Sequence, residues 1–282
     1  MTSVEKISAI STELNDRVSK PVSDTDTVSS SRVLISLIDV IKRFDLDPNV
    51  APAFGPVTGK IEVGEFLAVV GRSGCGKTTL LRLIAGLILP EAGVISYRSA
   101  PVTGPVDDLG MAFQQPTLLD WMTVLRNVTL QLEVRGIGSP DERNAQAMEV
   151  LGRVDLADFA NRRPYQLSGG QQQRVALCRA LVHNPALLLM DEPFAAVDAL
   201  TREHLQADLE QLWVARRPTV VLVTHSVSEA VLLADRVIVM QGPPGHVVAE
   251  IPIDLERPRF GTRDETDREV AALMRKVRQF VG

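Results

Sequence analysis

The chain has 282 residues, 45% hydrophobic and 23% charged, enough for one large domain or two small ones. Its net charge of −5 argues against a basic nucleic-acid-binding surface, and its two cysteines argue against a disulfide scaffold and favour a reducing compartment. It holds no apolar run approaching the roughly 18 residues of a membrane span and no secretory signal pattern at its N-terminus.

The predicted elements begin after a Ser- and Thr-rich segment, residues 1–30, which is expected to be a flexible tail. Apolar runs then predict strands at 33–40, 58–63, 66–70, 93–97, 109–113, 186–190, 219–224 and 237–240. Helices are predicted at 80–85, 168–182 and around 205–212, with a mostly helical stretch at 116–164. Apolar strands that alternate with helices are typical of a parallel sheet covered on both faces.

A last helix is predicted at Asp267–Phe280, after a proline-containing stretch. Thr266-Asp267-Arg268-Glu269 fits a capping box, and the apolar residues of the helix form one stripe. Packing of this stripe on the domain body is the main interpretation, and docking of a partner is the alternative.

The stretch Gly71-Arg72-Ser73-Gly74-Cys75-Gly76-Lys77-Thr78, here the phosphate loop, matches G-x-x-x-x-G-K-[ST] at every fixed position. It lies between a predicted strand and a predicted helix, the context in which glycine-rich backbone and a helix N-terminus hold a phosphate chain. Lys77 is expected to reach the β- and γ-phosphates, Thr78 to ligate Mg²⁺, and Thr79 to bind the nucleotide with the loop. A glycine-rich turn that binds nothing is the alternative.

Cys75 lies inside this loop, close to a helix N-terminus, where thiol pKa values fall. Its thiol is therefore expected to be reactive and to be protected by bound nucleotide.

Asp191 and Glu192 follow the apolar strand Leu187–Met190, and ligands bind beyond such strand ends in open α/β sheets. Asp191 is expected to hold the Mg²⁺ shell, and Glu192 to orient and polarise the attacking water as a general base. A helix cap and a solvated acid are the alternative.

Leu167-Ser168-Gly169-Gly170-Gln171, here the signature segment, opens a predicted helix. Its glycines leave backbone N–H groups bare and Ser168 offers a hydroxyl, which predicts a second anion site at a helix N-terminus. One nucleotide needs only one phosphate loop, so this segment is expected to face a nucleotide held by another copy. An ordinary serine N-cap is the alternative.

Three further polar residues follow predicted strands. His225 ends the strand 219–224, which should lie beside the strand carrying Asp191, so it is a candidate sensor of the γ-phosphate. Gln114 ends the strand before the helical insertion and could reach Mg²⁺ or the water. Asp198 lies just past the acidic pair, where a contact with another subunit could report on the site.

In this order, these motifs resemble the ATP-binding subunit of ABC transporters over about residues 32–245. The resemblance implies an α/β P-loop NTPase of ABC type, with a RecA-like, mostly parallel sheet core, an antiparallel β subdomain and a helical subdomain at about 115–170. It divides the chain into a flexible tail at 1–30, a nucleotide-binding domain at 31–245 and a C-terminal extension at 246–282 that ends in a helix.

The resemblance implies ATP and Mg²⁺ as cofactors, and it assigns family roles to individual positions. Lys77 corresponds to the Walker A lysine, Gln114 to the Q-loop glutamine, Ser168 to the signature serine, Asp191 and Glu192 to the Walker B aspartate and the catalytic glutamate, Asp198 to the D-loop aspartate and His225 to the switch histidine. Phe44 matches the aromatic that stacks on adenine, although Tyr is more frequent there, and a core Phe is the alternative. Arg72 and Ala195-Ala196-Val197 depart from the usual family residues.

The implied partners are an integral membrane permease, an extracytoplasmic solute-binding protein and a second copy in an ATP-dependent head-to-tail dimer, with no nucleic acid. The implied location is peripheral, at the cytoplasmic face of the inner membrane.

The segment Phe113–Val124 is similar to that of importers for nitrate, sulfonates and taurine, with Asp120 in place of a proline. Leu118–Trp121 is expected to help grip the permease, and packing of Trp121 inside the helical insertion is the alternative. A soluble ABC-type ATPase acting on nucleic acid or ribosomes is the competing function. The signature segment argues against an unrelated P-loop kinase or GTPase.

Overall fold

The computed structural model describes residues 32–45, 51–195, 197–260 and 266–281, without the side chains of residues 266 and 267. The predicted tail at 1–30, Ala196 and the side chains of the predicted capping box at Thr266 lie outside this description. Residues 34–282 form one folded unit. Among the described residues, no helix is both long and apolar enough to span a bilayer.

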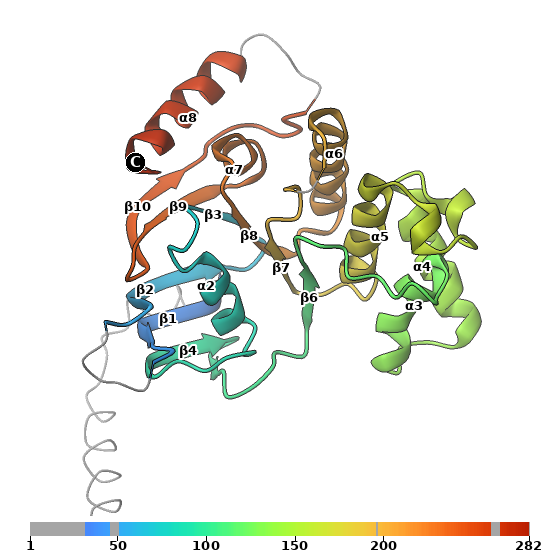
Figure 1. Cartoon of the computed structure of the whole chain (residues 1–282), viewed down its shortest axis with the longest axis horizontal. Helices are drawn as coiled ribbons and strands as arrows, with labels where there is room; N and C mark the ends of the chain where they lie inside the picture. Colours follow the sequence, from blue (N-terminus) through green and yellow to red (C-terminus); the bar gives the residue numbers. More distant parts are fainter. Residues whose placement is uncertain (1–31, 46–50, 196, 261–265, 282) are drawn as a thin grey trace, which may run out of the picture. The chain divides into compact units, whose positions relative to one another are not determined.

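A six-stranded sheet forms the centre of this unit, in the order β10-β9-β3-β8-β7-β6 (Figure 1). Its strands are β3 (Phe66–Val70), β6 (Leu109–Ala112), β7 (Leu187–Asp191), β8 (Thr219–Thr224), β9 (Arg236–Gln241) and β10 (His246–Pro252). All neighbouring pairs are parallel except β9 and β10. The parallel strands all end at the same edge, so the residues that follow them are brought together.

A second sheet has the order β2-β1-β4-β5. It contains β1 (Val33–Lys42), β2 (Phe54–Glu62), β4 (Ala92–Tyr97) and β5 (Ala100–Pro101). The pairs β1–β4 and β4–β5 are antiparallel, as expected for the antiparallel β subdomain.

The helices are α2 (Lys77–Ile84), α3 (Val124–Val134), α4 (Pro140–Gly152), α5 (Gly169–Leu181), α6 (Ala199–Arg216), α7 (Val227–Leu233) and α8 (Thr266–Val281), with short 3₁₀ turns at Ala157–Phe159 and Pro164–Gln166. Helices α3, α4 and α5 pack on one another and form the helical part on the right of Figure 1. Pro140 at the first position of α4 and the Ser139–Glu142 capping box fix where that helix starts.

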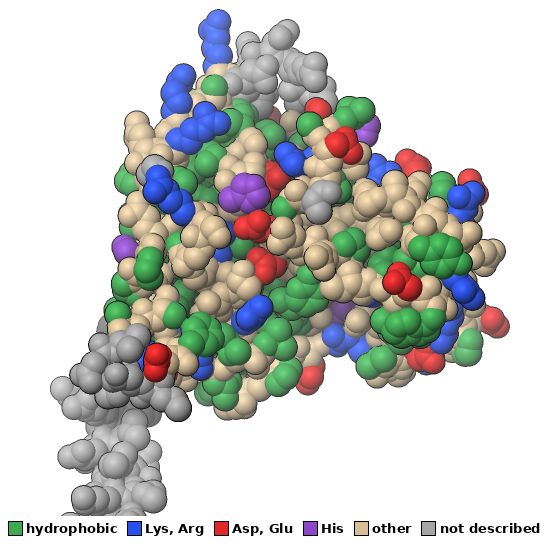
Figure 2. Space-filling model, viewed as in Figure 1, with side chains coloured by type: hydrophobic (Ala, Val, Ile, Leu, Met, Phe, Trp, Pro, Cys, Tyr) green, Lys and Arg blue, Asp and Glu red, His purple; other side chains and the backbone are tan. Residues whose placement is uncertain are grey.

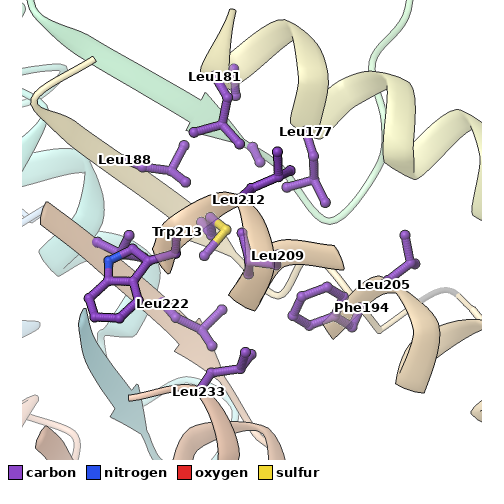
Figure 3. Close-up of a cluster of buried hydrophobic side chains, with 14 of the residues drawn as sticks. Leu177, Leu181, Leu188, Phe194, Leu205, Leu209, Leu212, Trp213, Leu222 and Leu233 are labelled. Carbon is purple, nitrogen blue, oxygen red and sulfur yellow. The ribbon is translucent and has the colours of Figure 1, made fainter. Parts of the chain in front are cut away.

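The central sheet is buried on both faces because alternate residues of its strands enter different cores. Leu67 and Val69 of β3 join a cluster with α2 and the antiparallel sheet. Phe66 and Ala68 join a second cluster with α5, α6, α7 and α8. Figure 3 shows this second core, with Trp213 of α6 beside the leucines of β7, β8 and α7.

The C-terminal region contains one strand that the sequence analysis did not predict. Strand β10 pairs with β9 from His246 to Pro252 and completes the edge of the central sheet. Helix α8 packs on α7 and β9, and Val277 on its apolar stripe is fully buried. The stripe therefore packs on the domain body, which is the main interpretation made from the sequence.

Candidate functional site

The carboxyl ends of three adjacent parallel strands assemble the site. Strand β8 lies between β3 and β7, with Val70 in register with Thr224 and Asp191 in register with Val223. The phosphate loop, Glu192 and His225 follow these strand ends directly. The predicted neighbourhood of the strands before Glu192 and His225 is therefore confirmed.

The backbone of the phosphate loop adopts left-handed conformations at two of its glycines. Gly74 and Gly76 have φ values of 81° and 95°, a left-handed conformation that a residue with a Cβ adopts only with strain. Lys77 opens α2, and its Nζ donates to the carbonyls of Gly71 at 2.8 Å and Arg72 at 3.0 Å. The ammonium group is thus buried and held across the loop by the loop's own carbonyls.

A pair of oxygen donors lies next to the loop. The Thr78 hydroxyl donates to Asp191 Oδ1 at 3.2 Å, which joins α2 to the end of β7. Burial raises the pKa of Asp191, while the hydrogen bond from Thr78 lowers it. A hydroxyl and a carboxylate on adjacent elements are suited to Mg²⁺, which binds few protein oxygens and takes the rest from phosphates and water.

Glu192 lies between two groups that can position it. Its Oε1 is 4.0 Å from Lys77 Nζ, and its Oε2 is 3.0 Å from His225 Nδ1. Its φ of 47° lies in the left-handed region, which is uncommon for a residue with a side chain and is often found at functional sites. The carboxylate is thus held in place by contacts on both sides.

A pocket of about 300 Å³ lies beside these residues. Its lining consists of Phe44, Ala53, Ser73, Gly74, Gly76, Lys77, Thr78, Thr79 and Glu192. Phe44 is 62% exposed and lines this pocket, so it is not a core residue. Ala53 was not predicted from the sequence, because nothing in the strand pattern marks the residue before β2 as a lining residue.

Cys75 departs from the expectation made for it. Its side chain is 1% exposed, and a Cβ on Gly71 would lie 2.7 Å from Cys75 Sγ. Cys75 and Arg72 line a different cavity, shared with Met240, Gln241, Gly242 and Val281. The expectation of a reactive thiol protected by nucleotide requires an accessible side chain. The burial of Cys75 and its place in a cavity shared with Val281 of α8 argue against it.

The signature segment forms a capped and exposed helix start. Ser168 caps α5, accepting from Gln171 N at 3.3 Å, and its own N–H donates to Gln171 Oε1 at 3.0 Å. Ser168 and Gly169 are exposed and Gly170 is half-buried. Within the described ranges, Ser168, Gly169, Gly170 and Gln171 do not line the phosphate-loop pocket.

Gln114 and Asp198 also lie outside the lining of that pocket. Gln114 is exposed just after β6, and its neighbour Phe113 accepts through its carbonyl from Gln173 of α5 at 3.2 Å. Asp198 caps α6 by accepting from Thr201 N at 3.0 Å, a backbone hydrogen bond that lowers the pKa of the carboxyl. The structure thus brings together the phosphate loop, Asp191, Glu192 and His225, and leaves Gln114, Asp198 and the signature segment on the surrounding surface.

Comparisons with known proteins agree with this geometry. Residues 54–195 match the ABC transporter family. The chain belongs to the ABC transporter family. It is 46% identical over 246 residues to an uncharacterized ABC transporter ATP-binding protein, MJ0412, of Methanocaldococcus jannaschii, which covers 87% of this chain and 90% of that one. It is 52% identical over 199 residues to the aliphatic sulfonates import ATP-binding protein SsuB of Pseudomonas fluorescens, which covers 71% of each chain.

Among solved structures, the ABC fold recurs in the ATP-binding cassette MJ0796. A dimeric post-hydrolysis state of MJ0796 bound to ADP and Pi has 34% identity and a TM-score of 0.69, covering 79% of this chain and all of that one. The ABC-type P-loop NTPase fold expected from the sequence is thereby confirmed. As a member of this family, the chain binds ATP with Mg²⁺ and hydrolyses ATP.

Proposed function

We propose that the chain is the ATP-hydrolysing subunit of an ABC importer that powers uptake of a small solute of the nitrate, sulfonate and taurine class through a separate membrane permease. The assignment of ATP hydrolysis rests on the contacts of Glu192 with Lys77 and His225, beside the pocket lined by the phosphate loop. Relatives named aliphatic sulfonates import ATP-binding protein support the solute class.

In this proposal each residue of the pocket has a distinct task. The Phe44 ring stacks on the base, and Lys77 holds the β- and γ-phosphates once it exchanges its loop carbonyls for phosphate oxygens. Glu192 orients the attacking water and accepts its proton, and His225 holds the Glu192 carboxylate in place. Thr78 and Asp191 would hold Mg²⁺, which would neutralise charge on the phosphate oxygens.

The exposed signature segment supports assembly with a second copy. A helix N-terminus favours an anion, and α5 presents this end on the surface rather than to the chain's own pocket. Cassettes of the same fold have been solved as dimers. Two copies related head to tail would place the signature segment of each against the nucleotide of the other, with Gln114 and Asp198 at the contact.

The turn that carries Trp121 supports a permease contact. Trp121 is 70% exposed, so it does not pack inside the helical subdomain. Buried Asn127 holds the turn from below, accepting from Leu119 N at 2.7 Å and donating to the carbonyls of Leu119 and Thr123. In Figure 2, hydrophobic side chains are exposed over the helical subdomain, on the right of the view. An exposed aromatic on a rigid turn is suited to anchor a partner.

The segment between Gln114 and Trp121 can transmit movement to that turn. Arg179 of α5 donates to the carbonyls of Pro116 at 2.9 Å and Thr117 at 2.8 Å, and so ties this segment to the helix that the signature segment opens. A shift of the signature helix on nucleotide binding would therefore move the turn. This proposal places the subunit at the cytoplasmic face of the inner membrane, with a solute-binding protein on the far side of the permease. No observation favours a role on nucleic acid or ribosomes.

Glu192→Gln tests the hydrolytic assignment. The amide keeps the shape of the side chain and removes the base, so ATP binding should persist while hydrolysis falls by at least about 10²-fold. We expect the variant to dimerise in saturating ATP and Mg²⁺, measured by light scattering. Glu256→Gln, an exposed site far along the chain, is the control. A Glu192→Gln variant that hydrolyses ATP within a few-fold of wild type would refute the assignment.

The import assignment has its own test. A tagged wild-type chain should recover an integral membrane protein from detergent-solubilised membranes, and loss of the chain should abolish uptake of an aliphatic sulfonate or of nitrate. Recovery of ribosomes or nucleic acid in place of a membrane protein would contradict it.

A further inference from the structure

The first turn of α6 lies between two elements of the catalytic machinery. On one side it meets the signature segment, where a Cβ on Gly170 would lie 2.3 Å from Thr201 Cγ2. The next residue, Arg202, extends towards α7, the helix that follows His225. Residues 201 and 202 thus contact both the surface offered to another copy and the neighbourhood of the chain's own base.

Arg202 fastens the segment that leads from Glu192 to Asp198. Its Nε donates to the Phe194 carbonyl at 3.2 Å, and its NH2 group donates to the Val197 carbonyl at 3.0 Å. The same Nε lies 3.7 Å from Glu229 Oε1. One guanidinium therefore holds two carbonyls of this segment and reaches a carboxylate on another helix, which uses the several fixed donors that only Arg offers.

Glu229 continues the connection to His225. It is 4% exposed, and its Oε2 accepts from the hydroxyl of Thr224, the last residue of β8. The Thr224 oxygen also accepts from Ser226 N at 3.0 Å, so both backbone neighbours of His225 are fixed. Burial raises the pKa of Glu229, which makes the nearby Arg202 cation important for keeping this carboxylate charged.

These contacts close a ring. It runs from Glu192 along the chain to Phe194 and Val197, through Arg202 to Glu229 and Thr224, and returns from His225 to Glu192 across the 3.0 Å contact. Arg202 and Glu229 are not in the lining of the phosphate-loop pocket. Their contacts with the Phe194–Val197 segment and with Thr224 bear on where Glu192 and His225 are placed.

We propose that Arg202 and Glu229 are positioning residues for ATP hydrolysis, which hold His225 against Glu192 and connect that pair to the Asp198 segment. The inference rests on the proposed roles of Glu192 as base and His225 as its holder. A misplacement of about 1 Å in a catalytic group can lower a rate by about 10²-fold, so the loss of either member should be large in turnover and small in nucleotide binding.

The test uses the full-length chain with Arg202→Ala and Glu229→Gln singly and together, and Arg216→Ala as a matched control at the far end of α6. We expect kcat to fall at least 10-fold in each single variant, KM for ATP to stay within about 2-fold, and the double variant to be no worse than the worse single one. Arg202→Lys keeps the positive charge but loses the several fixed donors of the guanidinium group. It replaces Arg202→Ala in the test if Arg202→Ala does not fold.

A spectroscopic signal separates positioning from a general loss of stability. The chain has four histidines, so the ¹⁵N signals of His225 can be assigned by comparison with His225→Gln. In folded Arg202→Ala and Glu229→Gln the ¹⁵N signals of His225 should move, because the imidazole of His225 leaves Glu192. The same signals should not change in Arg216→Ala.

Two outcomes overturn the inference. In the first, the folded Arg202 and Glu229 variants keep kcat within 2-fold of wild type while Glu192→Gln is inactive. That result overturns the positioning role and leaves the proposed function unaffected. The other is a lower melting temperature with unchanged kcat and His225 signals. An active Glu192→Gln variant would instead refute the base assignment on which the inference rests.

Discussion

Replacing Trp121 by Ala separates docking from packing, because the chain's other tryptophan supplies the opposite case. Trp121 is 70% exposed on a turn held by buried Asn127, whereas Trp213 is 1% exposed in the core shown in Figure 3. Truncation of the exposed ring removes little packing, so Trp121→Ala should change stability by no more than about 0.5 kcal/mol. Trp213→Ala should cost about 3–5 kcal/mol.

The expected loss of permease association follows from the exposed area. A tryptophan side chain presents about 250 Å². With 70% of it exposed, about 175 Å² is left for a partner to bury. At about 25 cal/mol per Å², full burial stabilises a complex by up to about 4 kcal/mol. Aromatic anchors measured by truncation contribute about 2–4 kcal/mol, which corresponds to roughly 30- to 1000-fold in affinity.

The assay compares the two alanine variants as tagged full-length proteins. Melting temperature and ATP binding are measured on the purified chains, and association is measured as recovery of the integral membrane protein that wild type retains in detergent. We expect Trp121→Ala to melt like wild type and to lose the membrane protein. The docking argument is refuted if Trp121→Ala retains the membrane protein fully, or if it melts as low as Trp213→Ala.

Three further results are expected. Phe44→Ala should weaken ATP binding by about 1–3 kcal/mol while Phe44→Tyr restores it, measured by calorimetry, and unchanged affinity in both would remove the stacking role. A thiol reagent should label no cysteine rapidly in the native protein, with or without ATP, and two in the denatured protein. The reason is that Cys75 and Cys178 are buried, and burial raises the pKa of Cys178 to about 12. Rapid labelling of native protein that ATP blocks would contradict this. Val277→Ala should lower stability by about 2 kcal/mol, seen as a melting shift that the exposed Lys276→Ala lacks, and equal shifts would show that α8 does not pack as described.

The parts of the site that follow from local pattern could be predicted from the sequence. Buried parallel strands read as short apolar runs, and the polar residues after them must meet at one edge, so the approach of the phosphate loop, Asp191 and His225 needed no tertiary information. The placement of Phe44 was predicted only through the family resemblance. It depends on how β1 and β2 fold against the loop, which no local pattern encodes.

Other features were missed for identifiable reasons. Strand β10 has a single buried residue, Ile251, follows prolines at 243 and 244 and ends at Pro252, so its pattern resembled a loop. Its pairing with β9 makes it a strand. The direction of Cys75 depends on Gly71 and Gly245, which leave space for the sulfur and for the loop backbone. The sequence analysis assigned no role to Arg202 or Glu229, because their contact joins two helices that are separated in the sequence.

The residues of the proposed site fall into two groups, those assembled within one chain and those outside the pocket. Thr78 contacts Asp191, and Glu192 contacts both Lys77 and His225, so the groups proposed to bind phosphate and activate water assemble within one chain. Ser168 and Asp198, by contrast, cap α5 and α6, and neither they nor the rest of the signature segment line this pocket. Because Thr201 contacts Gly170 and Arg202 lies 3.7 Å from Glu229, the first turn of α6 joins the signature segment to the helix that follows His225. If the proposed dimer forms, this turn would connect the contact between the two copies to the proposed base, Glu192.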